Sequence, residues 1–311
     1  MPFFSIVIPL FNKENYIENT LKSIFNQEFT DYEVIVVNDC STDKSPEKAK
    51  NMGNEKITII HHNENKGLSA ARNTGIRNSK AEYIAFLDAD DVWKPSFLKT
   101  ISEMILRFPD AEVFATNYEE IYPNQRILPK NKLKKNKEKY SIIPFFEYGT
   151  SQPVYIPSSV CVKKNVFEKT GYYDEEISYG EDIDFNIRLN LNHQLAYTPE
   201  ALVEYTMYSE NQITNTKLGN KGIPDFNKYE EYCSKKNKLK KYLDFNRYIF
   251  AKLYKVEKNE EKRKKIIQEI SLKNLNIIQI ILLYLPISIL KKIQFLKMYF
   301  LRKGIKIATY T

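Results

Sequence analysis

The stretch FFSIVIPLFNKENYIENTLKSIFNQ (residues 3–27), followed by EVIVVN (33–38), decides the fold class. FFSIVI and EVIVVN are short apolar runs rich in Ile, Val and Phe, as in buried strands. Residues 14–27 between them carry a helical pattern. A strand, a helix and a second strand in this order predict the beginning of a parallel α/β sheet.

The same alternation continues along the chain. Further strands are predicted at 56–61, 82–88, 111–118 and 195–205, and helices at 43–52, 67–79, 94–107, 163–170 and from Glu181 onward. Residues 119–158 are polar and proline-rich, so no regular structure is predicted there. The pattern indicates a doubly wound, mostly parallel sheet, in which ligands bind at the carboxyl ends of the strands.

The charge of the chain is uneven. The net charge is +8, but residues 235–311 alone carry 20 Lys and Arg against 5 Asp and Glu. Because the composition also turns to Asn, Gly, Lys and Pro near 215–227, we predict an α/β domain over 1–215 and a basic helical region over 216–311. Three widely spaced cysteines and no recognisable export signal favour a cytoplasmic protein.

Three acids in FLDADD (86–91) follow an apolar strand. In an extended chain Asp88 and Asp90 lie on one side, and paired carboxylates beside substrate phosphates suit Mg²⁺ or Mn²⁺. The alternative for these two residues and Asp91 is a solvated turn that caps the next helix.

Two other polar residues stand at comparable places. Asp39 ends the strand 33–38 and can accept a hydrogen bond from a nucleobase or ribose, or it caps a turn. Arg72 lies one turn into the helix that begins in NKGLSAARNTGI (65–76), where it can bind phosphate or remain a surface residue.

The segment SYGEDIDFNIRLNL (178–191) places Glu181 and Asp182 in the first turn of a helix. Such an acid can act as a general base, or it can complement the helix dipole. Asp184 and Arg188, four residues apart, are predicted to form an ion pair.

IVIPLFNKENYIENTLKSIFNQ, EVIVVNDCSTDKS, NKGLSAARNTGI, YIAFLDADD and GED together resemble the family-2 glycosyltransferases of GT-A fold, over about residues 3–210. The resemblance implies inverting transfer of a sugar from a nucleotide diphosphate, usually UDP, to an acceptor hydroxyl, with Mn²⁺ or Mg²⁺. By position it implies a nucleobase pocket at Pro9 and Asp39, a nucleotide contact at Arg72, and a metal and diphosphate motif at Asp88 and Asp90.

The resemblance also implies that Asp182 is the catalytic base, with Glu181 adjoining it; Asp182 is favoured to take the proton, and Glu181 is the alternative. The Q-x-x-R-W motif of processive relatives is missing, and the one tryptophan, Trp93, follows the acid triplet. We therefore expect transfer of one or a few sugars and no synthesis of a long polymer. The resemblance further implies a glycan or lipid-linked acceptor in surface-glycan biosynthesis. A nucleotidyltransferase would open with a glycine-rich loop, whereas a non-catalytic sugar-nucleotide-binding or scaffold protein would lack these acids.

The basic tail predicts contact with a membrane surface. The apolar run IIQIILLYLPISIL (277–290) is too short to span a bilayer, and KKIQFLKMYFLRKGIK (291–306) mixes basic and apolar residues like an interfacial helix. We expect binding to the inner face of the cytoplasmic membrane. The alternatives are a helix packed on the catalytic domain or a contact between two copies of the chain. Nucleic-acid binding is disfavoured, because no recognition motif accompanies the charge.

Overall fold

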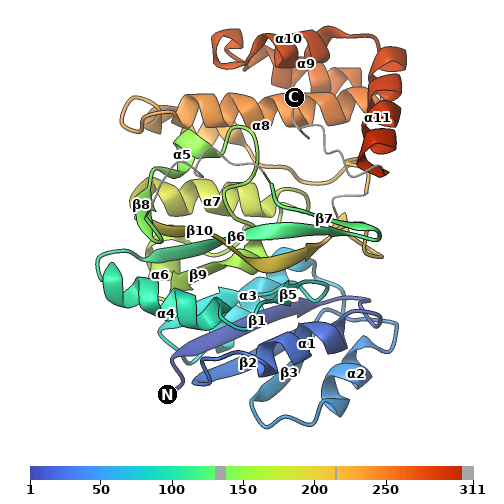
Figure 1. Ribbon diagram of the computed structural model, residues 1–311. Coiled ribbons are helices and arrows are strands. Elements are labelled where there is room, and N and C mark those ends of the chain that lie inside the picture. The colour runs from blue at the N-terminus through green and yellow to red at the C-terminus, as the bar shows by residue number, and fades with distance from the viewer. Residues whose placement is uncertain (130–137, 214–215, 303–311) are drawn as a thin grey trace.

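The computed structural model describes residues 1–129, 138–213 and 216–302, and a ten-stranded sheet runs through this part of the molecule (Figure 1). The strands are β1 Phe4–Leu10, β2 Tyr32–Asn38, β3 Ile57–His61, β4 Tyr83–Phe86, β5 Val92–Trp93, β6 Val113–Tyr122, β7 Gln125–Ile127, β8 Ser141–Ile143, β9 Val160–Lys163 and β10 Leu195–Thr206. The main order is β3-β2-β1-β4-β9-β6-β10-β5, with β7 beside β6 and β8 beside β10. Strands β3, β2, β1 and β4 are mutually parallel, as are β6 and β10.

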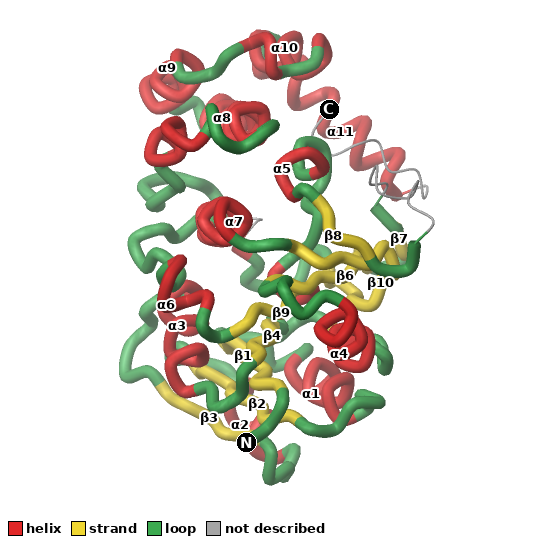
Figure 2. Tube along the Cα trace, turned by 90° about the vertical axis from the view of Figure 1, so that its left-hand side faces the viewer, coloured by secondary structure: helices red, strands yellow, loops and turns green. Residues whose placement is uncertain are grey.

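The helices cover both faces of the sheet and then continue beyond it. They are α1 Ile17–Phe25, α2 Ser45–Asn51, α3 Leu68–Asn78, α4 Phe97–Arg107, α5 Phe145–Tyr148, α6 Val166–Thr170, α7 Glu181–Asn192, α8 Leu239–Val256, α9 Glu260–Gln268, α10 Ile277–Tyr284 and α11 Ile287–Arg302. In Figure 2, α1 and α4 lie on one side of the sheet and α3, α6 and α7 on the other. The predicted α/β class, with a mostly parallel central sheet and a helical C-terminal region, is confirmed.

Helix α3 lies unusually close to β1, and a glycine makes this possible. A Cβ added at Gly75 would come within 2.3 Å of Val7 Cγ1. Because real Cβ contacts are longer, a larger residue would push α3 away from the sheet. The close approach fixes the position of Arg72, one turn earlier on the same helix.

Residues 119–158 contain more regular structure than predicted. β6 continues to Tyr122, and β7, β8 and α5 follow, although part of the lysine-rich stretch 130–139 lies outside the described residues. The sequence prediction also missed β9, which pairs antiparallel with both β4 and β6. A strand of four residues is too short to show a period, and neighbouring strands supply its hydrogen bonds.

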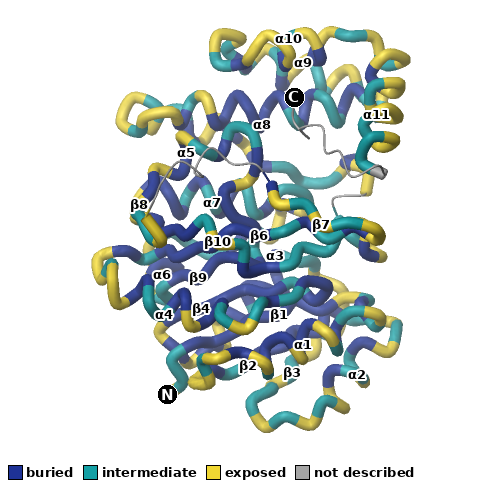
Figure 3. The backbone as a smooth tube through the Cα atoms, in the orientation of Figure 1, coloured by how far each residue is buried: buried dark blue, intermediate teal, exposed yellow. Residues whose placement is uncertain are grey.

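The C-terminal helices begin as part of the main core. Tyr242 of α8 packs against Phe145 and Phe146 of α5, and Phe250 packs edge-on against Tyr179, which precedes α7. Helix α8 therefore packs against the α/β part of the chain, and the predicted domain boundary at 215/216 falls beside residues outside the described part. Helices α10 and α11 lie farther out and carry many exposed residues (Figure 3).

Candidate functional site

Two of the predicted site residues lie at the carboxyl ends of neighbouring parallel strands. Pro9 is buried near the end of β1, and Asp39 follows β2. Asp39 is 3% exposed and accepts hydrogen bonds from the backbone amides of Lys66 and Gly67, both 2.8 Å, and one of its oxygens lies 2.7 Å from His62 Nδ1. Asp39 therefore stabilises the loop that leads into α3. Its Oδ2 accepts only the Gly67 hydrogen bond within the described residues, and this oxygen retains a lone pair.

The carboxylates of Asp88 and Asp90 point to different partners. Asp88 Oδ1 accepts a hydrogen bond of 2.8 Å from Arg72 Nη2, and the Asp88 side chain is 24% exposed. Asp90 Oδ2 accepts one of 2.7 Å from the Lys13 ammonium and is nearly enclosed. The two residues predicted to bind metal thus each have a basic partner.

The third acid of the triplet has a structural role. Asp91 is fully buried and accepts hydrogen bonds from the Thr206 amide and the Ser158 hydroxyl. Burial, together with the charges of Asp90 and Asp88, holds the pKa of Asp91 well above its usual range. Asp91 therefore joins the loop after β4 to the end of β10 and to the turn before β9.

Arg72 connects two of the sequence motifs. Its side chain is 1% exposed, with Nη2 on Asp88 at 2.8 Å and Nη1 on Glu181 at 3.0 Å. The guanidinium also lies over the ring of Tyr173, 5.3 Å from its centre. Arg72 is therefore not a surface residue, and it positions two acids of the site. A direct contact to a nucleotide stays a prediction.

The first turn of α7 carries acids with distinct environments. Glu181 is buried against Arg72, whereas Asp182 is half-buried and has no ion pair within the described residues. Burial, and secondly the charge of Glu181, raises the pKa of Asp182 to about 7, although Arg72 acts in the opposite direction. The predicted pair of Asp184 and Arg188 is confirmed at 2.9 Å. Asp182 is thus the acid of this turn suited to exchange a proton near neutral pH.

Whether a divalent cation can bind here depends on the free oxygens of the Asp88 and Asp90 carboxylates. Within residues 1–129, 138–213 and 216–302, no cluster of three or more His, Cys, Asp or Glu side chains is arranged to hold a metal. However, Asp88 and Asp90 each use one oxygen in hydrogen bonds, and their second oxygens accept none from the described residues. Two hard oxygen donors fit a Mg²⁺ or Mn²⁺ ion that takes its other ligands from phosphates and water.

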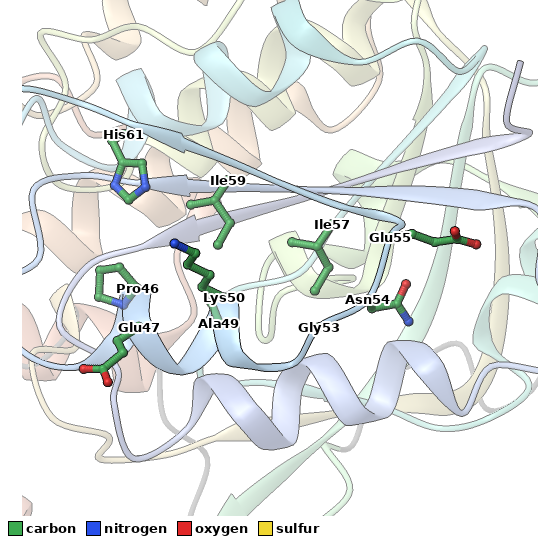
Figure 4. Close-up of a pocket in the computed structure, with 10 residues that line it drawn as sticks. All are labelled: Pro46, Glu47, Ala49, Lys50, Gly53, Asn54, Glu55, Ile57, Ile59 and His61. Atoms are coloured by element: carbon green, nitrogen blue, oxygen red, sulfur yellow. The ribbon is translucent and has the colours of Figure 1, made fainter.

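A hollow of about 720 Å³ lies elsewhere, between α2 and the edge strand β3 (Figure 4). Its walls include Lys50, Ile59 and His61, and none of the predicted site residues lines it. The hollow is therefore separate from the acids described above.

Sequence reasoning did not single out three residues that the structure places at the site. Lys13 bonds Asp90, Tyr173 lies beneath Arg72, and Ser209 also donates to Asp90. Lys13 lies within the quoted stretch 3–27, just after the first strand. No spacing rule links a residue there to an acid 77 positions later. Only the assembled sheet brings them together.

The chain matches the sequence model of glycosyl transferase family 2 over residues 5–171. It is 30% identical to an uncharacterised glycosyltransferase of Rickettsia typhi over 239 residues, which cover 74% of this chain and 69% of the relative. It is 37% identical to glycosyltransferase GlyA of Streptococcus pneumoniae over 115 residues, 37% of this chain and only 16% of GlyA.

A solved structure agrees with the fold. Staphylococcus aureus TarS 1–349, in complex with UDP-GlcNAc, superposes with a TM-score of 0.67 at 18% identity, over 88% of this chain and 82% of that structure. At this identity the likeness supports the fold alone. The motifs, the positions of their residues and the family match lead to one conclusion: the chain belongs to glycosyltransferase family 2.

Proposed function

We propose that this glycosyltransferase moves a sugar from a nucleotide-diphospho-sugar to an acceptor hydroxyl with inversion, in bacterial surface-glycan biosynthesis. The observation that carries the proposal is the chain of contacts from Asp88 through Arg72 to Glu181, next to Asp182. It connects the acids after β4 with the first turn of α7. The proposed site therefore combines Asp88, where the diphosphate would bind, with Asp182, a base whose pKa lies near neutrality.

The donor is proposed to be a UDP-sugar, with its base at Pro9 and Asp39. The free lone pair of Asp39 Oδ2 can accept a hydrogen bond from a base N–H, and the bonds to Lys66 and Gly67 fix its direction. The complex of TarS with UDP-GlcNAc, a protein of the same fold, supports this class of donor.

In the proposed reaction Asp182 removes the proton of the acceptor hydroxyl while that oxygen attacks C1 of the donor sugar. The C1–oxygen bond to the diphosphate breaks, and direct displacement inverts the anomeric centre. Asp88 and Asp90 would hold Mn²⁺ or Mg²⁺, which neutralises charge on a leaving diphosphate when bound. Arg72 keeps Glu181 in place beside the base, so that Asp182 remains the acid facing the acceptor.

The proposal is tested with a panel of nucleotide-sugars, assayed for metal-dependent hydrolysis and for protection against thermal unfolding. Asp90→Ala is expected to lower donor affinity and turnover by at least the roughly 10- to 100-fold that loss of an outer-shell metal partner costs. Asp110→Ala, which removes an exposed acid after α4, is the matched control and should leave both unchanged. Full turnover of the Asp90 variant, or full activity in excess chelator, would contradict the metal assignment.

We also propose that α10 and α11 bind the membrane surface on its cytoplasmic side, where a lipid-linked acceptor would lie. Ile277 is 69% exposed, Tyr284 55% and Phe295 73%, and the exposed Lys291 and Lys292 lie on the same helix as Phe295. No helix among the described residues is long and apolar enough to cross a bilayer. Exposed apolar side chains beside lysines suit a helix in the interface of an anionic membrane.

Phe295→Asp is expected to weaken binding to anionic vesicles by about 10- to 100-fold, because one buried aromatic contributes about 1.5–3 kcal/mol. Vesicle flotation measures the effect, and higher salt should weaken binding of the wild type. Leu106→Asp is the control, since Leu106 is 81% exposed on α4. Point variants are preferable to truncation, because Leu283 and Leu290 are buried in the main core. Equal flotation of wild type and Phe295→Asp would contradict the proposal.

A further inference from the structure

A buried ammonium lies beside one of the two proposed metal ligands. Lys13, in the loop after β1, is 9% exposed, and its Nζ donates to Asp90 Oδ2 at 2.7 Å. The same nitrogen donates to Ser209 Oγ at 3.0 Å and to the backbone oxygen of Glu210 at 2.6 Å. All three protons of the ammonium thus have an acceptor, so the position of the Lys13 side chain is fixed by hydrogen bonds.

These contacts attach the loop after β10 to the acids after β4. The Ser209 hydroxyl also donates to Asp90 Oδ2, and Asn15 Nδ2 donates to Glu210 Oε2 at 3.0 Å. Asp90 Oδ2 therefore accepts from both Lys13 and Ser209, which uses both of its lone pairs. A divalent cation at Asp90 must use Oδ1 beside a positive charge, or displace the ammonium from Oδ2.

We propose that Lys13 competes with the divalent cation for Asp90 and so sets how much metal the donor site requires. The inference rests on the proposed metal role of Asp88 and Asp90. Its physical basis is charge: an ammonium and a divalent ion on one carboxylate repel each other, and a nearly enclosed site screens this poorly. Occupation of Asp90 by metal would also loosen Ser209 and Glu210, because Lys13 holds both.

The competition is tested by metal binding without donor, measured from the free Mn²⁺ signal in paramagnetic resonance titrations. Lys13→Met is expected to bind Mn²⁺ about tenfold more tightly than the wild type, because the competing charge is gone. Lys13→Arg keeps the charge and should bind as weakly as the wild type. Ser209→Ala removes a neutral donor from the same oxygen, and its Mn²⁺ affinity should change far less than that of Lys13→Met.

Lys13→Gln is a second uncharged variant, which can be used if Lys13→Met folds poorly. It should show the same increase in Mn²⁺ affinity. Equal or weaker Mn²⁺ binding in the folded uncharged variants, with binding still abolished by Asp90→Asn, would overturn competition while leaving the metal assignment intact. Mn²⁺ binding that is unchanged by Asp90→Asn, or absent from wild type and Lys13→Met alike, would overturn both. The two failures are therefore distinguishable.

Discussion

Asp182→Asn is expected to lower the rate of sugar transfer by roughly 10²–10⁴-fold, the range for loss of a general base. Donor affinity should change little, because the amide keeps the size of the carboxylate and the proposed donor contacts lie on other residues. When the two are measured separately, the single-turnover rate of transfer should fall while the affinity for the donor stays nearly unchanged. Equal losses in binding and transfer would instead indicate a role in holding the donor.

The same base assignment predicts the pH dependence of the wild type. The pKa of Asp182 is raised to about 7, so the carboxylate is protonated, and inactive as a base, below that pH. The value of kcat/KM should therefore fall as the pH drops through about 7, and Asp182→Asn should lose this limb.

Glu181→Gln is the comparison that decides between the two neighbouring acids. Burial is the main cause of the raised pKa of Asp182, and this variant removes the second cause, the charge of Glu181, so the acidic limb should move to lower pH while transfer continues. The variant also weakens the contact to Arg72, which calls for a parallel measurement of stability. If Glu181→Gln is inactive in sugar transfer and Asp182→Asn is active, the base is Glu181.

The sequence was sufficient to place Asp39 and Asp88 at the same edge of the sheet. Each follows an apolar run that forms a strand, and parallel strands end at a common edge. The regular alternation of strand and helix made that part of the fold predictable, and the bounds of β2 and β3 differ from the prediction by one residue.

The partners of these acids could not be predicted in the same way. Arg72 and Glu181 are 109 residues apart, and Arg72 lies on a helix that approaches β1 closely at Gly75. The sequence indicated an arginine suited to phosphate, whereas in the structure its two terminal nitrogens bond protein carboxylates. Side-chain pairing across elements depends on how those elements pack, which local periodicity does not encode.

Arg72→Met is expected to lower the free energy of unfolding by about 3–5 kcal/mol, the cost of removing one partner from a buried ion pair. Glu181 is buried and would be left without its counter-charge, while the side chain of Asp88 is 24% exposed and can regain water. Most of the loss should therefore arise at Glu181. Urea unfolding measures the change, and Arg77→Met is the control: on the same helix, its side chain is 55% exposed and pairs with Glu175 only at 3.9 Å.

A double variant separates a charge effect from a packing effect. If the unpaired Glu181 carboxylate causes the loss, Arg72→Met combined with Glu181→Gln should be more stable than Arg72→Met alone. If the stacking of the guanidinium on Tyr173 dominates, the second change should bring no recovery. Where Arg72→Met remains folded, the acidic limb of kcat/KM should also move to higher pH, because Arg72 lowers the pKa of Asp182 in the wild type. An unchanged limb would mean that Arg72 stabilises the fold without acting on the base.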